Sequence, residues 1–210
     1  MARGTAASAP TGKRAERSRR AIVAAAREVF LRDGFDASVD VVAATAGVSK
    51  VTVYNHFGCK EDLFTAVVED ALDEIGSTLS QVKADVLAAE DVREVLTRTA
   101  RAMVAEAIEP PRPELRNLVT GELRRFPEIG RAWQERGPGR FAGLLGEILG
   151  HLTERGRLAV GDIEVATIQF FGLTVYPHLI FNSFGTTLTA DLAERLIREG
   201  VDMFLRRYAT

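Results

Sequence analysis

The segment from residue 49 to residue 60, SKVTVYNHFGCK, gathers hydrogen-bonding side chains within about two turns of a predicted helix. Lys50 and Tyr54 are four residues apart and therefore share one side of this helix. Val51 and Asn55 share the same side, one position further on. These side chains carry ammonium, amide, phenol and methyl groups. A DNA major groove offers matching partners, namely hydrogen-bond acceptors on base edges, thymine methyl groups and flanking phosphates.

The opposite side of this segment explains how a short helix could hold that surface. Val51, Thr52 and Val53 in succession disfavour an isolated helix, because β-branched side chains lose rotamer freedom there. Val53 and Phe57 fall toward neighbouring helices, so packing must hold the segment. An alternative interpretation is a helix buried against a second domain.

The elements before and after the segment are also predicted to be helical. Apolar residues recur at helical spacing between Ile22 and Phe30, and Gly34 stands where a left-handed helix end is expected. Ser38 can cap a second short helix that stops at Gly47, and Ser49 can cap a third. A fourth helix opens near Lys60. Three short helices joined by a tight glycine turn form a helix-turn-helix outline.

The same stretch resembles the DNA-binding domain of the TetR family of transcriptional repressors. The resemblance rests on AGVS at 46–49, on T-x-Y-x-H-F at 52–57 and on K-E-x-L at 60–63, and it covers roughly the first 75 residues. It implies that three side chains face bases: Lys50, Val51 and Asn55. It also implies that four contact the DNA backbone: Thr52, Tyr54, His56 and Lys60. Ser49 would cap the recognition helix and direct its N-terminus at a phosphate.

Two positions depart from the family pattern. Val51 stands where such proteins often have a small residue or proline, which leaves the base preference open. Cys59 stands where a serine usually caps the fourth helix. A cysteine at a helix start beside Lys60 could favour a thiolate and redox sensitivity, although most single cysteines are packing or capping residues.

Composition limits the classes of protein to consider. The chain has 210 residues, of which 46% are hydrophobic and 27% charged, as in ordinary globular proteins. No apolar run of about 18 residues occurs, and no secretory signal is visible, so we expect a cytoplasmic protein without a membrane partner. One cysteine excludes an internal disulfide and a cysteine-based zinc site.

The remaining chemistry-bearing residues predict neither a metal site, a cofactor nor an enzyme. His56, His151 and His178 share no ligand spacing. Glu147 and His151 are an i, i+4 pair, but no nucleophile motif or glycine-rich phosphate loop accompanies them, and a surface ion pair is the simpler interpretation.

Charge is divided unevenly along the chain. Residues 1–60 contain 10 Lys or Arg against 5 Asp or Glu, whereas the remaining residues contain 17 against 24. A basic N-terminal third is typical of a part that meets a polyanion, although a charged stretch can also be only a solvated face.

We expect an all-α protein divided into a disordered basic arm at 1–15, a helix-turn-helix DNA-binding domain at 16–60 and a helical bundle for ligand binding and dimerisation at 61–210. Proline and glycine breaks separate the later helices. These are predicted at Leu63–Ile75, Val92–Ile108, Glu114–Phe126, Phe141–Glu154, Ile163–Phe184 and Ala190–Tyr208.

Residues 115–138 resemble C-terminal domains described as AefR-like, which implies a bundle of five or six helices but no ligand identity. Cavities between bundle helices are common ligand sites. The candidates for lining one are aromatic residues and a histidine, each of which could equally be plain core: Phe126, Trp133, Phe141, Phe170, Phe171, Tyr176 and His178.

The predicted helix Ile163–Phe184 is apolar nearly all round and must be covered on more than one side. Together with Ala190–Tyr208 it is the natural place for a four-helix dimer interface, as the family resemblance also implies. A buried pair of helices in a monomer is the alternative. The predicted interface residues are Ile168, Phe181, Ile197, Val201, Phe204 and Tyr208.

Together with the family resemblance, these patterns favour a homodimeric repressor that binds a palindromic operator in double-stranded DNA and is released by a small, mostly apolar effector. The direction of this response is implied by the resemblance alone. The alternatives are a DNA-organising protein that senses nothing and an enzyme built on the C-terminal bundle.

Overall fold

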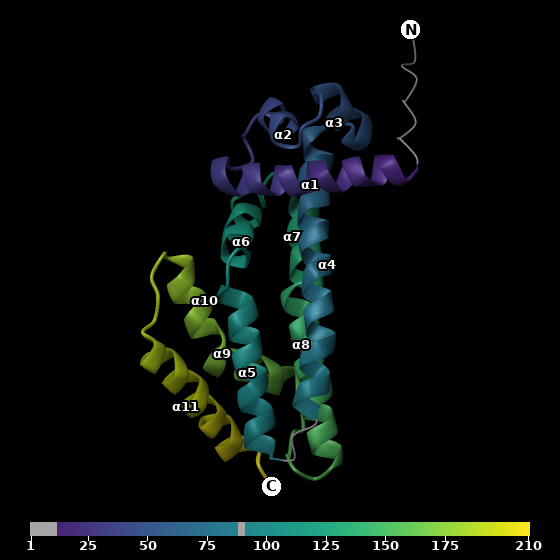
Figure 1. Ribbon diagram of the computed structural model, residues 1–210. Coiled ribbons are helices and arrows are strands. Elements are labelled where there is room, and N and C mark those ends of the chain that lie inside the picture. Colours follow the sequence, from purple (N-terminus) through teal and green to yellow (C-terminus); the bar gives the residue numbers. More distant parts are fainter. Residues whose placement is uncertain (1–11, 88–90) are drawn as a thin grey trace. The chain divides into compact units, whose positions relative to one another are not determined.

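The computed structural model describes residues 12–87 and 91–210, and the side chains of residues 12–74 and 91–210. Within that part the chain is helical, with one isolated bridge between Leu158 and Ala209 and no strand. The helices are α1 Lys13–Asp33, α2 Val39–Thr45, α3 Lys50–Phe57, α4 Lys60–Leu87, α5 Val92–Ile108, α6 Arg112–Gly121, α7 Pro127–Arg136, α8 Pro138–Glu154, α9 Ile163–Thr174, α10 Tyr176–Ser183 and α11 Ala190–Tyr208 (Figure 1). The all-α prediction is confirmed.

Several predicted helix boundaries were wrong. α1 begins at Lys13, inside the predicted arm, because Lys, Arg and Ala are good helix formers that continue its register. Residues 1–11 of that arm lie outside the described residues. α4 extends past the predicted end at Ile75 to Leu87.

Three other predicted helices also differ from the structure. α6 begins at Arg112 and not at Glu114, and α8 begins at Pro138 and not at Phe141. The predicted helix Glu114–Phe126 ends at Gly121, and a separate helix, α7, begins at Pro127. The predicted helix Ile163–Phe184 divides into α9 and α10, which are bent by 50°. Pro177 has no N–H to donate to residue 173, and its ring disfavours the helical conformation of Tyr176.

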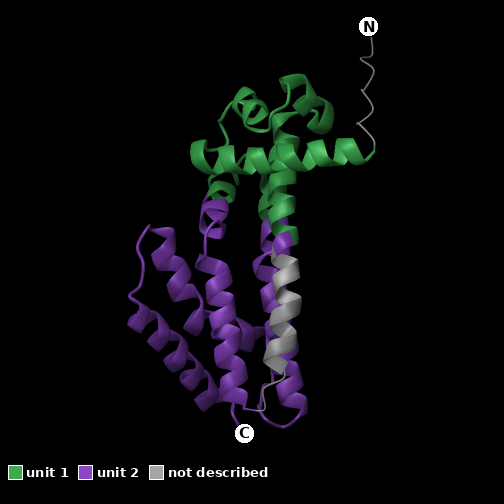
Figure 2. Cartoon of the chain, in the orientation of Figure 1, with its two compact units in different colours: residues 1–73, 118–130 green, residues 74–117, 131–210 purple. Residues whose placement is uncertain are grey.

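The chain forms two compact units, which Figure 2 colours separately. Unit 1 contains residues 1–73 and 118–130, and unit 2 contains residues 74–117 and 131–210. The predicted division at residue 60 therefore differs from the observed one, since unit 1 includes the first half of α4 and a segment from far along the chain.

Unit 1 is built around a cluster of four phenylalanines. Three of the rings lie with each pair of ring centroids 5.1 to 6.0 Å apart: Phe30 of α1, Phe35 in the loop after α1, and Phe64 of α4. Phe126, from the 118–130 segment, adds a fourth ring at 5.1 Å from Phe35 and 5.4 Å from Phe64. All four side chains are buried, so the downstream segment completes the core of this unit.

Arg125 covers that cluster from the same segment. Its guanidinium lies 4.4 Å from the ring centre of Phe35 and forms an ion pair of 3.2 Å with Glu61 at the start of α4. The contacts of Arg125 with Phe35 and Glu61 therefore attach residues 118–130 to the rest of unit 1.

Unit 2 is a bundle in which α11 packs against α9 and α5, and α9 packs against α8 and α10. α9 and α11 approach closely at Gly200, where an added Cβ would lie 2.8 Å from the carbonyl oxygen of Leu173. Phe170 and Phe204 meet edge to face between these two helices, with ring centroids 5.2 Å apart. No single described helix is long and apolar enough to span a membrane; only the bent pair of α9 and α10 meets that test, by length and composition.

Candidate nucleic-acid interface

The turn between α2 and α3 follows from one glycine. α2 ends at Thr45, and Gly47 after it has a φ of 67°, a left-handed conformation that costs glycine no steric strain. The N–H of Val48 donates to the carbonyl oxygen of Ala43 at 3.0 Å, and that of Gly47 to Ala44 at 3.2 Å. These two bonds close the end of α2 and direct the chain into α3 at a sharp angle.

The start of α3 is fixed by Ser49, as predicted. Its Oγ accepts a hydrogen bond of 3.1 Å from the backbone N–H of Thr52 and shares a second bond of 2.8 Å with the Thr52 hydroxyl. α3 then ends at Gly58, whose φ of 71° allows the reversal into α4. A cap and two positive-φ glycines therefore bracket the predicted recognition helix.

The two sides of α3 are as the helical pattern predicts. Val53 and Phe57 are buried against neighbouring helices, and the Arg19 guanidinium of α1 lies 5.1 Å from the ring centre of Phe57. Val51, by contrast, is 67% exposed and Tyr54 is 40% exposed. An apolar and an aromatic side chain are thus held in solvent by a helix whose other face is fixed.

The remaining predicted contact residues lie around this exposed face. Lys50 and Asn55 are exposed, while Thr52 and His56 are half-buried. Lys60, past the turn, is half-buried with its ammonium 4.6 Å from the ring centre of Phe35. The eight predicted residues therefore lie on α3, on its capping residue Ser49 and on the first residue of α4, where the Lys60 ammonium is directed at the ring of Phe35.

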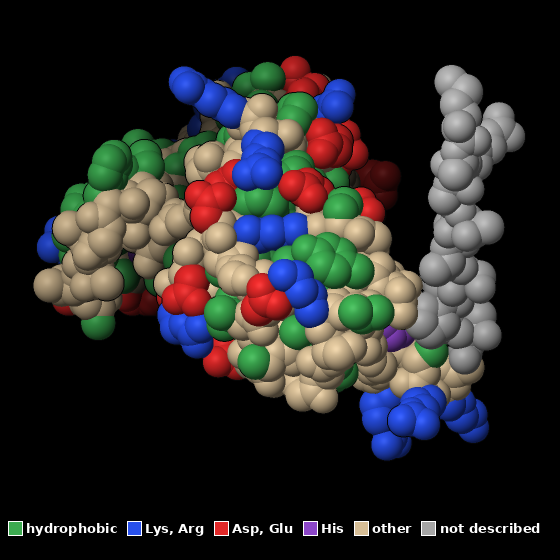
Figure 3. All heavy atoms as spheres, turned by 90° about the horizontal axis from the view of Figure 1, so that it is seen from above, with side chains coloured by type: hydrophobic (Ala, Val, Ile, Leu, Met, Phe, Trp, Pro, Cys, Tyr) green, Lys and Arg blue, Asp and Glu red, His purple; other side chains and the backbone are tan. Residues whose placement is uncertain are grey.

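Basic side chains border the same surface. The first turns of α1 present a run of exposed cations: Lys13, Arg14, Arg17, Arg19 and Arg20. Figure 3 shows Lys and Arg gathered at one edge of the face, with acidic side chains interspersed elsewhere on it. Such a basic edge can bind the phosphates of a nucleic acid, while the exposed face of α3 contacts its bases.

One acidic residue in this surface was not anticipated. Lys50 Nζ donates to Asp40 Oδ2 of α2 at 2.8 Å. The hydrogen bond from Lys50 lowers the pKa of Asp40, and the same bond raises the pKa of Lys50. A carboxylate at the second position of a helix, ten residues before a lysine that starts the next one, is the sequence signal that could have revealed this pair.

Cys59 does not have the thiolate character that its position suggested. Its sulfur accepts a bond of 3.4 Å from the backbone N–H of Asp62 and so caps α4 weakly. Burial is the main cause of a raised pKa for the thiol; the backbone N–H of Asp62 lowers this pKa, while the side chains of Asp62 and Glu61 raise it. These surroundings oppose the thiolate, contrary to the expectation of an electropositive setting.

The predicted ligand residues do not form one group. Phe126 belongs to the core of unit 1, because it packs on Phe35 and Phe64. In unit 2, Trp133 and Phe171 are half-buried, Phe141 and Phe170 are buried, and Tyr176 is largely exposed. His178 is 3% exposed, and its Nε2 has no hydrogen-bond partner within the described part of the chain. Burial lowers the pKa of this imidazole.

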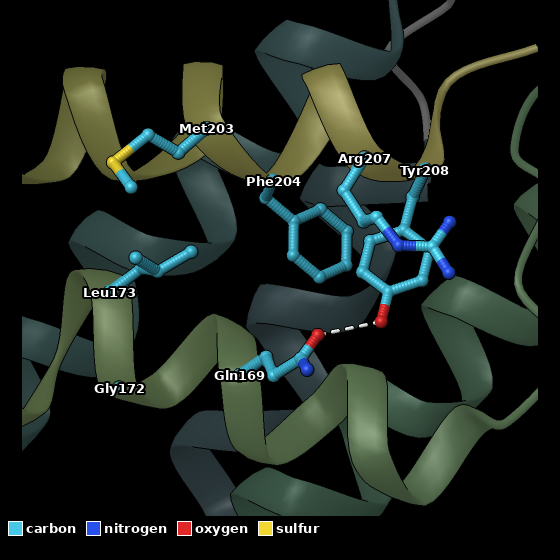
Figure 4. A pocket seen from close by; sticks show the side chains of 7 residues that line it. All are labelled: Gln169, Gly172, Leu173, Met203, Phe204, Arg207 and Tyr208. Atoms are coloured by element: carbon cyan, nitrogen blue, oxygen red, sulfur yellow. Dashed lines mark hydrogen bonds between the residues drawn. The ribbon is translucent and has the colours of Figure 1, made fainter.

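A groove of about 320 Å³ lies between α9 and α11, and none of the seven predicted ligand residues lines it. Figure 4 shows the Tyr208 hydroxyl directed at Gln169, to which it donates a hydrogen bond of 2.6 Å. Met203 and Arg207 border the groove from α11, and Gly172 borders it from α9.

The predicted dimer residues separate into two groups. Ile168 and Phe181 are 56% and 46% exposed, as an interface residue must be in a single chain. The four others lie on α11, which packs against α9 and α5, and are buried within the single chain: Ile197, Val201, Phe204 and Tyr208. Six other apolar or aromatic side chains on α9, α10 and α11 or directly after α10 are also exposed and were not predicted for the interface: Val165, Tyr176, Ile180, Phe184, Leu192 and Met203.

Comparison with known families accounts for both units. The model of the N-terminal region of bacterial regulatory proteins of the tetR family matches residues 22–67. The model of the C-terminal domain of AefR-like transcriptional repressors matches residues 94–210, which is more than half of the chain. The chain belongs to the TetR family of transcriptional regulators.

Individual TetR-family proteins resemble the whole chain. A TetR-family transcriptional regulator from Mesorhizobium loti is 30% identical, superposes with a TM-score of 0.87, and the match covers 95% of this chain and all of that one. The transcriptional repressor AcnR from Corynebacterium efficiens is 26% identical over 194 residues, which cover 90% of this chain and 94% of that protein.

A third similarity is confined to a shorter stretch. The transcriptional activator FasR from Mycolicibacterium smegmatis is 39% identical over 61 residues, and this match spans only 29% of the chain and 28% of FasR. Of these two relatives, FasR is thus described as an activator and AcnR as a repressor.

Proposed function

We propose that this protein is a homodimeric, effector-responsive transcriptional repressor that binds a palindromic operator. The observation that carries the proposal is the exposed face of α3. Val51 and Tyr54 remain in solvent there, whereas Val53 and Phe57 anchor the helix from behind. Exposing these apolar and aromatic groups to water does not stabilise the protein, but the same groups complement the edges and methyl groups of base pairs in a major groove.

Each subunit contributes one α3 to one half-site. Lys50, Val51 and Asn55 face the bases, and Thr52, Tyr54, His56 and Lys60 contact the backbone. The N-terminus of α3, capped by Ser49, carries unpaired N–H groups and a positive dipole end that favour a phosphate. Half-sites in such complexes are about one helical turn or a multiple apart, so an inverted repeat is expected.

The second copy of the chain docks on the exposed apolar side of α9 and α10. Ile168, Ile180 and Phe181 are each about half exposed, and Phe184 is 81% exposed. Monomeric proteins rarely leave that much contiguous apolar surface in water, and a homodimer is the arrangement in which a palindromic site is read twice. The buried side chains of α11 support this surface from beneath.

The effector binds within unit 2 and contacts His178. The His178 imidazole is nearly completely buried, and its Nε2 has no hydrogen-bond partner among the residues that the structure describes, so a bound molecule can supply that hydrogen bond. Thr167 Oγ1 of α9 is a second buried oxygen without a partner among the described residues. Repression is favoured over activation because the longer matches, to AcnR and to the AefR-like repressor domain, are to repressors. A regulator of this kind acts in the cytoplasm, where bacterial DNA lies.

Selection of binding sites from randomised double-stranded DNA tests the function. The purified protein should enrich an inverted repeat, and footprinting should protect both half-sites. A pair of variants separates the two kinds of contact. Asn55→Ala should relax the preference at one base pair, at a cost of about 1 to 3 kcal/mol against the preferred base.

Lys60→Ala should leave the enriched sequence unchanged and make the decrease of log affinity with log salt shallower by about one unit. Failure to enrich any sequence would contradict the proposed function. If both variants shifted the sequence preference alike, α3 would not be the element that reads the groove.

A further inference from the structure

Asp40 of α2 holds the first residue of the recognition helix. Its Oδ2 accepts a hydrogen bond of 2.8 Å from the ammonium of Lys50, ten residues further along the chain. Lys50 is one of the three residues placed at the bases, so an acidic side chain stands directly beside a reading group.

The carboxylate of Asp40 is oriented by a second donor. The hydroxyl of Ser38 donates to the same oxygen at 3.2 Å, while Ser38 Oγ accepts the backbone N–H of Asp40 at 3.1 Å. Donors from two elements therefore converge on Oδ2. They also lower the pKa of Asp40, with the bond from Lys50 as the larger cause, so the group is ionised in the neutral range.

Stability does not explain this arrangement. Both side chains are well exposed, at 48% for Lys50 and 63% for Asp40, and exposed ion pairs contribute little to folding. Ser38 and Ser49 already cap α2 and α3. A lysine in the first turn of a helix is moreover at the end where the helix dipole disfavours a cation. Asp40 suits the first turn of α2, where the helix dipole favours a carboxylate, but Lys50 at the start of α3 is not explained by folding and requires another reason.

We infer that Asp40 is a specificity-determining residue: it directs the Lys50 ammonium toward base acceptors and cancels its charge toward phosphates. This inference rests on the proposed function, since it assigns Asp40 a role in reading the operator. An ammonium has three N–H donors, and one is used by Asp40. Two remain for acceptors such as the O6 and N7 atoms of guanine.

The cancelled charge matters most on random DNA. Binding without sequence preference depends on phosphate neutralisation, and each cation that contacts a phosphate adds about 0.9 to the slope of log affinity against log salt. A lysine paired with a carboxylate adds little attraction to any phosphate. It can still donate to a base, so the pair lowers random binding more than operator binding.

Asp40→Asn tests this inference, because it removes the charge and keeps the size and an oxygen that Ser38 can reach. Affinity for random-sequence DNA should increase several-fold at low salt, and its decrease between 50 and 200 mM salt should be about 3.5-fold larger than for the wild type. Affinity for the selected operator should rise less, so the ratio of specific to random affinity falls. Site selection should show a relaxed preference at one base pair.

Two control variants separate the pair from a general change of charge. Asp70→Asn removes an exposed carboxylate on α4 in the same unit and should leave the ratio and the base preference unchanged. Asp40→Asn in a Lys50→Ala background should no longer steepen the salt dependence, because the freed cation is absent. Circular dichroism checks that each variant is folded.

The outcomes are distinct. An unchanged ratio of specific to random affinity in Asp40→Asn, or the same change with and without Lys50, overturns the inference while the operator-binding function stands. A wild-type protein that enriches no DNA sequence overturns both.

Discussion

Phe126→Ala should destabilise unit 1, although residue 126 lies 53 residues beyond the end of its main segment. The ring is 7% exposed and packs on Phe35 and Phe64 with centroids 5.1 and 5.4 Å away. Truncation of a buried phenylalanine costs about 3 to 5 kcal/mol. Since Phe126 lies at the edge of the cluster and Arg125 can partly cover the gap, we expect about 3 kcal/mol.

Hydrogen exchange measured by mass spectrometry locates that loss. A change of about 3 kcal/mol raises the open fraction of the affected helices roughly a hundredfold. Amides of α1 and of the first half of α4 should therefore exchange faster in Phe126→Ala. Trp133, the only tryptophan, lies in unit 2, so the denaturant midpoint reported by its fluorescence should change little.

Phe204→Ala provides the matched control in unit 2. Phe204 is 1% exposed and packs on Phe170 at 5.2 Å and on Tyr208 at 4.7 Å. Its truncation should accelerate exchange in α9 and α11 and lower the Trp133 midpoint, while α1 stays protected. If Phe126→Ala instead accelerated exchange in α9 and α11 and spared α1, residues 118–130 would not be part of the core of unit 1.

Two further outcomes are expected. Ile168→Arg should give a folded monomer in sedimentation velocity at micromolar concentration, because the side chain of Ile168 is exposed. Ile197→Arg should instead unfold the chain, because the side chain of Ile197 is buried. An Ile168→Arg variant that remained dimeric would contradict the proposed interface. The free energy of unfolding should fall as pH drops below about 6.5, because the pKa of His178 is lowered in the folded chain and the unfolded chain binds the proton first. His178→Leu should make this pH dependence weaker, as measured by urea denaturation at several pH values. If the free energy of unfolding of this variant decreased with pH as steeply as that of the wild type, His178 would not be the cause.

The helix-turn-helix was predictable because its determinants are local. Ser38, Ser49, Gly47 and Gly58 act within a few residues of themselves, so caps and turns can be read without knowledge of the fold. The helices α5 and α11 were predicted with their observed bounds for the same reason. Pro177 carried a local signal too, but the apolar composition around it favoured one long helix.

The rest depended on contacts between distant parts of the chain. No local pattern distinguishes Phe126, in the core of unit 1, from Phe141 in unit 2. The apolar side of α11 was predicted to be a dimer interface because an apolar helix face must be covered. The sequence does not show whether its own chain or a second copy covers it. Phe204 is covered by α9 of its own chain, whereas Ile168 is not covered within the chain.

Val51 is the residue of α3 whose presence folding explains least. Val53 is justified by burial, and Thr52 by its bonds with Ser49, but Val51 is 67% exposed and is a poor helix former in an eight-residue helix. Val51→Ala should therefore raise the free energy of unfolding by about 0.5 kcal/mol. The same change removes methyl groups that can meet a thymine, so operator affinity and the preference at one base pair should both decrease. Urea denaturation and site selection measure the two effects, and a variant that was less stable or bound the operator unchanged would contradict this role for Val51.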